Sequence, residues 1–220
     1  MRCSVKRRWV IVGLTCIALI GAGISVRAYR SHRRFVKWAA VYRIRAERGD
    51  AKSQYALAAM YYYGQGVPKN YVEAARWYLK SAEQGNVDAE YSISSIYYSG
   101  NGLAKDYSEG ARWCLKAAEQ GDASAQYSLG LIYHHSLGVP RDDAEAVRWY
   151  RKSADQGYVK AQYNLGYMYY YGYGAPQDRV EAVRLFREAA AQGDEYAQRA
   201  IECDRKGTSI DPGAGLRGLQ

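Results

Sequence analysis

Apolar and small residues recur at helical spacing through most of the chain, and glycine-containing turns interrupt them. Residues 51–63 place tyrosine, leucine and alanine on one helical face. The segment 64–68, Gly-Gln-Gly-Val-Pro, ends that helix because its glycines permit positive φ and its proline disfavours a helical residue before it. A second helix is predicted over 71–84, with Trp77 on its inner face. The pattern therefore predicts two helices joined by a short turn.

This helical pair recurs with a period of 36 residues. Five glycines keep that spacing without a slip: Gly49, Gly85, Gly121, Gly157 and Gly193. Four complete units are predicted at 49–84, 85–120, 121–156 and 157–192, and residues 193–205 supply the first helix of a fifth. Neither helix of a pair can bury its apolar face alone, so the units must stack on one another.

Polar residues indicate where the second helix of each unit begins. Asn70 and the aspartates at its equivalent positions are N-cap residue types, and a glutamate follows each three residues later, which predicts a capping box. Arg76 and its equivalents follow that glutamate by three residues and are expected to pair with it. Small residues at the register of Ala58 predict a close approach of helices, with the second-helix tryptophan filling the adjoining space.

The repeat resembles the Sel-one-like repeat family, a tetratricopeptide-like class, over about residues 49–205. The third unit carries the family pattern at Ala125, Leu129, Gly130, Tyr133, Gly138, Val139, Asp142, Ala146, Trp149, Tyr150, Lys152, Ala154, Gln156 and Gly157. The resemblance implies an all-α fold, a right-handed α–α superhelix or solenoid of 36-residue helix–turn–helix repeats. It also implies a scaffold or adaptor that binds a protein or peptide partner on a concave surface lined by first helices.

The segments that flank the repeats carry their own predictions. Residues 35–48 match a second-helix pattern, so we expect them to form a helix that caps the stack. The glycine-rich tail 206–220 is expected to be disordered.

The amino-terminal segment is predicted to reach a membrane. Residues 9–26 contain no charged side chain, and basic residues flank them on both sides, including the basic segment 1–8. Eighteen helical residues extend roughly 27 Å, close to the hydrocarbon thickness of a bilayer. We expect a single-span anchor with the repeats outside the cytoplasm, periplasmic or extracellular. A cleaved signal peptide, with Val26 and Ala28 as its small residues, is the alternative and would give a secreted protein.

The net charge of +9 belongs to the amino-terminal part of the chain. Residues 1–48 hold 12 of the 31 Lys and Arg and one of the 22 acidic residues, which leaves 49–220 with a net charge of −2. Nucleic-acid binding by the repeats is therefore not expected, because phosphate affinity needs clustered cations.

No motif for catalysis stands out in the sequence. Ser-x-x-Lys, Gly-x-Ser-x-Gly, His-Glu-x-x-His and Cys-x-x-Cys are all missing. We expect no catalytic residue, cofactor, metal or small-molecule substrate. The adjacent His134 and His135 are interpreted as replacements for a tyrosine pair of the other copies. A cell-wall-associated hydrolase, or an accessory protein of one, stays as an alternative function.

One face of the first helix varies between copies while the core positions do not. This face holds positions 52, 56, 59 and 63 and their equivalents, and it is either plain solvent surface or a recognition surface. Exposed tyrosines favour recognition because they give a large contact area at a low entropy cost. The predicted partner-binding residues are Tyr63, Ser95, His134, His135, Asn164, Tyr167, Tyr170, Tyr171 and Tyr173.

Overall fold

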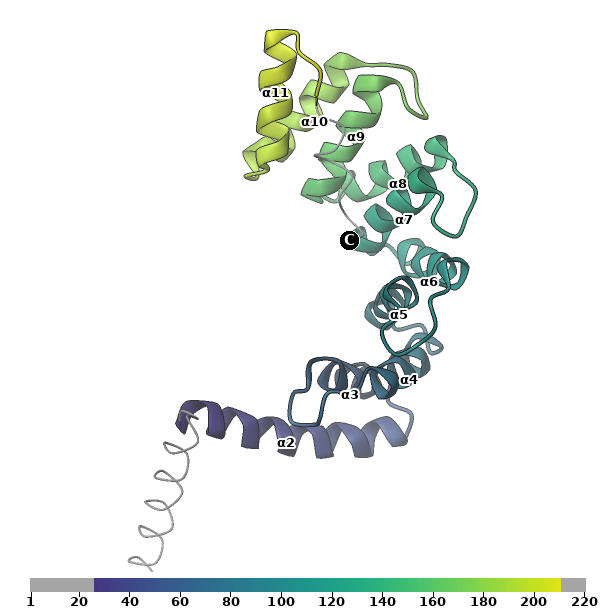
Figure 1. Ribbon diagram of the computed structural model, residues 1–220, viewed down its shortest axis with the longest axis vertical. Coiled ribbons are helices and arrows are strands. Elements are labelled where there is room, and N and C mark those ends of the chain that lie inside the picture. Colours follow the sequence, from purple (N-terminus) through teal and green to yellow (C-terminus); the bar gives the residue numbers. More distant parts are fainter. Residues whose placement is uncertain (1–25, 211–220) are drawn as a thin grey trace, which may run out of the picture. The chain divides into compact units, whose positions relative to one another are not determined.

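The computed structural model describes residues 26–210, with side chains placed from residue 33 onward. This part of the chain is all-α, with ten helices and no strand (Figure 1). The helices are α2 (Val26–Glu47), α3 (Ala51–Tyr63), α4 (Tyr71–Ala82), α5 (Val87–Ser99), α6 (Tyr107–Glu119), α7 (Ala123–His135), α8 (Asp143–Asp155), α9 (Val159–Tyr171), α10 (Arg179–Ala191) and α11 (Glu195–Lys206). The first helices α3, α5, α7, α9 and α11 start at the predicted spacing of 36 residues.

The chain forms two compact units, Met1–Ser81 and Ala82–Gln220. In the first unit, α3 packs against α2. In the second, each helix from α5 to α11 packs against the next one along the chain. Figure 1 shows these helices following one another in chain order. Within the second unit, the helical pairs therefore nest side by side in sequence order, as their apolar faces require.

The predicted capping helix is part of a longer element. Helix α2 starts at Val26, nine residues before the expected start of the 35–48 helix, and it ends at Glu47. Its last turn acts as a second helix, because the Gln54 side-chain amide donates to the Ala46 carbonyl at 3.1 Å. Gln126 makes the same bond to Ala118 at 3.1 Å, at the same register of the repeat.

Most of the predicted membrane segment lies outside the described residues. The basic segment 1–8 and the span 9–26 fall there, except for Val26, the first residue of α2. Within residues 26–210, no helix combines the length and the apolar character that crossing a bilayer requires.

The second helices begin at the predicted N-caps. The Asp106 carboxylate accepts a hydrogen bond from the Glu109 backbone N–H at 3.0 Å, and the other three copies repeat this bond. The second bond of the predicted capping box, from the Asp106 N–H to the Glu109 carboxylate, is wrong. The Asp106 N–H donates to the Tyr97 carbonyl instead, and the Glu109 carboxylate binds Arg112. The Arg–Glu pairs three residues apart are confirmed in all four copies. Because they are exposed, each contributes only about 0.3–0.5 kcal/mol.

The small residues of the first helices lie directly under aromatic rings. A Cβ built on Gly130 would lie 2.5 Å from Cε1 of Tyr150, and one on Gly166 would lie 2.8 Å from Cε1 of Phe186. The predicted close approach is confirmed, but the ring that fills the space belongs to the residue after the tryptophan register. Trp149 instead joins a buried cluster with side chains of α6, so it packs between neighbouring repeats.

Hydrogen bonds between polar side chains, buried on the first helix and exposed at the end of the second, join the two helices of each repeat in the second unit. Side-chain amides at the ends of second helices donate to the first helix, from Gln156 to Gln126 at 2.7 Å and from Gln120 to the Glu90 carboxylate at 2.7 Å. Glu90 is only 3% exposed. Burial raises the pKa of Glu90 above its ordinary value, and the hydrogen bond from Gln120 offsets only part of that rise.

We expect Glu90→Gln to raise the free energy of unfolding near pH 7 by roughly 1 kcal/mol, because it removes a buried carboxylate and keeps an acceptor for Gln120. A carboxyl whose pKa is higher in the folded state stabilises below its unfolded pKa, and this contribution is lost as pH rises through the folded pKa. The gain should therefore shrink at about pH 4 and below. Urea unfolding at both pH values measures it.

The exposed Glu119→Gln serves as the matched control for this prediction. It makes the same chemical change one residue before Gln120 and should leave stability unchanged at both pH values. An equal effect of the two substitutions would mean that net charge, and not the burial of Glu90, sets the difference.

Candidate protein-interaction surface

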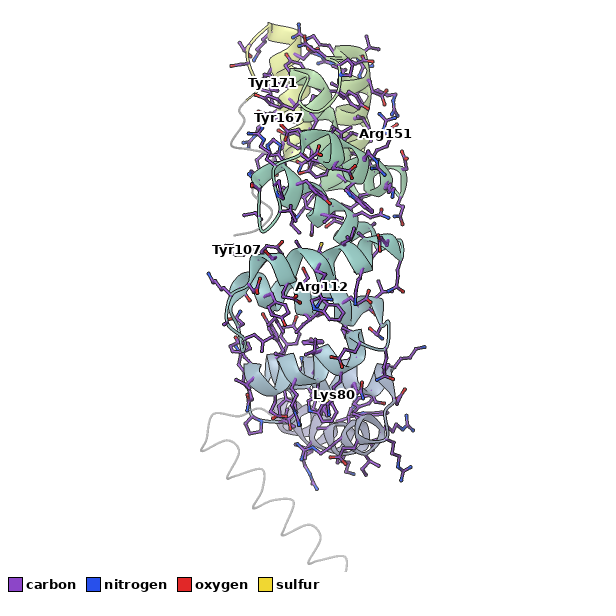
Figure 2. The ribbon with its side chains drawn as sticks, turned by 90° about the vertical axis from the view of Figure 1, so that its right-hand side faces the viewer. Lys80, Tyr107, Arg112, Arg151, Tyr167 and Tyr171 are labelled. Atoms are coloured by element: carbon purple, nitrogen blue, oxygen red, sulfur yellow. The ribbon has the colours of Figure 1, made fainter. Side chains whose placement is uncertain are left out.

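Four tyrosines gather where α9 ends, and we call them the tyrosine cluster: Tyr167, Tyr170, Tyr171 and Tyr173. The ring centroids of Tyr167 and Tyr171 lie 4.8 Å apart, and Tyr173 lies 5.9 Å from Tyr171 and 6.2 Å from Tyr167. Figure 2 shows Tyr167 and Tyr171 next to one another on one side of the second unit. Gly172, in the left-handed conformation, ends α9 and turns Tyr173 back onto the other rings.

Much of the predicted face is covered by other parts of the protein. Asn164, Tyr167 and Tyr170 are buried, and so is His134 on α7. The expectation of an open surface is wrong for these four residues. Neighbouring rings of the second unit lie against them: the centroid of Tyr173 lies 6.2 Å from Tyr167 and 6.3 Å from His134, and that of Phe186 on α10 lies 6.4 Å from Tyr170. Ile210, beyond α11, belongs to the same buried cluster as Tyr167 and Tyr170.

The remaining predicted residues keep some or all of their exposure. Tyr63 is 66% exposed on α3 in the first unit. In the second unit Ser95 and His135 are exposed, Tyr173 is 39% exposed, and Tyr171 is half-buried. His135, Tyr171 and Tyr173 all lie where a first helix meets its loop. Apart from Ser95 within α5, the accessible residues of the predicted set thus lie at the carboxyl ends of first helices or in the loop that follows.

A buried imidazole lies beside this surface. Nδ1 of His134 lies 2.7 Å from Oδ1 of Asp143, whose other oxygen accepts from the Arg141 guanidinium at 2.7 Å. Burial raises the pKa of Asp143, but the hydrogen bonds from Arg141 and His134 together lower it by more. The pKa of Asp143 therefore lies below its ordinary value. The rings of His134 and His135 meet edge to face at 4.9 Å. In the part of the chain described, no three His, Cys, Asp or Glu side chains gather as a metal site would require.

Burial disfavours the charged forms of one thiol and several phenols in the second unit. Burial raises the pKa of the Cys114 thiol to about 12 and that of Tyr127 to about 12. Burial also raises the pKa of Tyr171, more than its hydrogen bond to a backbone carbonyl lowers it. These groups therefore suit hydrogen bonding and packing rather than proton transfer or nucleophilic attack.

The sequence alone did not point to two residues of this surface. Ile210 is only 3% exposed, and its carbonyl accepts a hydrogen bond from the Tyr171 hydroxyl at 2.8 Å. Arg179 binds the Tyr170 hydroxyl and forms an ion pair with Asp204 at 3.3 Å. The prediction that the tail is disordered is therefore wrong for residues 206–210. Residues 211–220 lie outside the described part of the chain. The repeat pattern gives no signal for Ile210, because its register holds a glycine in each inner loop.

The comparison with protein families decides what these helical pairs are. The Sel1 repeat model matches four consecutive segments of the chain, residues 51–86, 87–122, 123–158 and 159–194. The chain belongs to the Sel1 repeat family. This confirms the resemblance drawn from the sequence, and the four matched Sel1 repeats correspond to the four complete helical pairs. Proteins of this family typically mediate protein–protein interactions.

Two solved structures share the Sel1 repeat fold with this protein. One is a protective antigen of uropathogenic Escherichia coli strains with an SLR fold, 32% identical over 93% of this chain, with a TM-score of 0.76. The other is a Sel1 repeat protein from Oxalobacter formigenes, 36% identical over 76% of this chain, with a TM-score of 0.70. The matched regions span 43% and 49% of those two proteins. No curated protein matches the sequence significantly.

Proposed function

We propose that this Sel1 repeat protein is a non-catalytic scaffold that binds a protein or peptide partner at the carboxyl ends of its first helices. The observation that carries the proposal is the set of accessible side chains there, the exposed His135 and Tyr173 beside the half-buried Tyr171. Their rings are held by neighbouring rings, so a partner would order few side chains on binding. Aromatic side chains held in this way are typical of recognition surfaces.

Site-specific crosslinking tests this proposal in the full chain. A photoreactive amino acid would replace Tyr173 or His135 in cells, and Val180, which is 84% exposed on α10, would serve as the matched control. We expect discrete protein adducts from the first two positions and none from the third. Equal adducts from all three positions, or none from any, would contradict binding at the first-helix ends.

We propose further that residues 9–26 tether the repeats to a membrane and that the repeats lie outside the cytoplasm. The uncharged span between basic flanks supports the tether, and a basic amino end followed by one span is the basis for the orientation. Helix α2 supports the tether as well, because Trp38, Val41 and Ile44 are exposed there beside basic side chains such as Lys37. Such a mixture of apolar and basic groups suits the surface of an anionic bilayer.

A reporter active only outside the cytoplasm, fused after Gln220, tests the orientation. We expect activity in the membrane fraction, and a silent reporter would reverse the orientation. The mass of the mature protein separates the anchor from the secreted alternative, since cleavage near Ala28 would remove the span.

A further inference from the structure

The chain returns to its own repeats after the last helix. Gly207, with a φ of +67°, ends α11, and the Thr208 N–H donates to the Cys203 carbonyl at 3.0 Å. Residues 208–210 then turn back toward α9 (Figure 1), where the Ile210 carbonyl accepts a hydrogen bond from Tyr171. Ile210 is buried in the cluster that contains Tyr167 and Tyr170, although no helix or turn includes it. A non-helical segment therefore adds one branched aliphatic side chain to a buried cluster that contains several aromatic rings.

An inner repeat shows a similar bond at the neighbouring register. The Tyr98 hydroxyl at the end of α5 donates to the Leu137 carbonyl at 3.0 Å, in the loop of the following repeat. The Tyr171 hydroxyl, one position later in the repeat register, donates to the Ile210 carbonyl at the end of α9. At the ends of these two first helices, a tyrosine hydroxyl thus binds the carbonyl of a non-helical segment. In the last repeat this segment belongs to the tail.

The tail differs from a loop in the side chain that it brings. The loop residue one period before Ile210 is Gly174, where an added Cβ would lie 2.0 Å from the Asp143 carbonyl oxygen. Inner loops must therefore carry glycine at this register, whereas the tail carries an isoleucine that is buried.

We propose that the tyrosine cluster and Tyr171 hydroxyl form a binding site for an extended peptide with a branched aliphatic side chain, and that residues 207–210 occupy this site in cis. The inference rests on the proposed function and names the partner's chemistry. A partner must supply a backbone carbonyl for Tyr171 and an aliphatic side chain for the site of Ile210. It must also displace the tail.

A partner could displace the tail because few interactions attach Ile210 to the repeats. One hydrogen bond from Tyr171 and the burial of one side chain fix Ile210 to the first-helix end. The tail is nevertheless a strong competitor, since a tethered segment acts at a millimolar effective concentration. A free peptide of the same sequence should therefore bind the intact protein weakly and a tail-opened variant more tightly.

The test uses a fluorescent synthetic peptide with the sequence of residues 205–214 and the detergent-solubilised full chain. Ile210→Asp should open the site, and fluorescence anisotropy should then show at least about tenfold tighter peptide binding than to the wild-type protein. Ile210→Val, which keeps a branched aliphatic side chain, is the matched control and should behave as the wild type. A peptide with aspartate in place of its isoleucine should not bind. Adding Tyr171→Phe to Ile210→Asp should weaken binding about fivefold.

Circular dichroism would verify that each variant is folded, and a chain ending at Gly207 would replace Ile210→Asp if that substitution unfolds the protein. A folded, opened variant that binds the peptide no better than the wild type would overturn the proposal and leave the tail as a structural cap. In that case crosslinking from Tyr173 would still test the proposed function independently. If the opened variant binds the peptide but no partner is crosslinked from Tyr173 or His135, the peptide site is supported and the proposed scaffold function is contradicted.

Discussion

Replacing Gly138 with alanine is expected to lower the free energy of unfolding of the second unit by about 3–4 kcal/mol. Gly138 lies in the loop after α7 with a φ of +80°. A Cβ there would lie 2.2 Å from the carbonyl carbon and oxygen of Tyr107, at the start of α6. These are backbone atoms and cannot swing aside, so the loop or the neighbouring repeat must shift.

Gly157→Ala is the matched control, because it measures the cost of the left-handed backbone conformation without the steric contact present at Gly138. Gly157 also has a φ of +80°, but no atom lies within 4 Å of the position that its Cβ would take. We expect a loss of about 1–2 kcal/mol there, the cost of the left-handed conformation alone. Urea unfolding followed by the fluorescence of Trp113 and Trp149 measures both variants. Equal losses would mean that repeats do not meet at Gly138.

Truncating Tyr150 to alanine is expected to cost about 3–5 kcal/mol. The Tyr150 side chain is fully buried, and its ring lies directly against the backbone of α7 at Gly130. No other side chain can collapse into this space without moving a helix, so a cavity remains. Because each repeat contacts only its neighbours, the loss should also loosen the adjoining repeats.

Tyr150→Phe is the matched control for this truncation. The Tyr150 hydroxyl is buried and makes no hydrogen bond of ordinary geometry, so removing it should change the stability by less than about 1 kcal/mol. Urea unfolding measures the two variants side by side, and hydrogen exchange locates the loosened helices. A large loss in the phenylalanine variant would show that the hydroxyl, and not the ring, holds the two helices together.

The repeat architecture could be predicted because its signals are local. An N-cap such as Asp106 contacts a backbone N–H three residues away, and a glycine such as Gly100 ends its own helix. Because the period is 36 residues, each of these local signals recurs at the same position in several copies, which makes the prediction of helices and turns more secure. The predicted bond from the Asp106 N–H to the Glu109 side chain does not form, because the Asp106 N–H donates to a carbonyl of the preceding helix and Glu109 binds Arg112.

The candidate surface could be predicted only in part. Variation between copies pointed to the end of α9, but it did not distinguish an exposed side chain from one covered by a different neighbour. Tyr173 is exposed, whereas Tyr167, on the same variable face, is buried in a cluster that also contains Ile210. The pattern of one repeat holds no information about the segment beyond the last repeat, so the burial of the tail could not be predicted from the period.

By itself, the sequence determined the length of the repeat, the positions of its helices and turns, and membership of the Sel1 repeat family. These properties arise from periodicity and from contacts a few residues apart along the chain. Only the tertiary structure decided which ring fills the space over Gly130, that Glu90 is buried, and that Ile210 lies among the rings beside α9. The physical reason is that burial depends on distant segments packing together, and identical local patterns meet different neighbours at the middle and at the end of a stack.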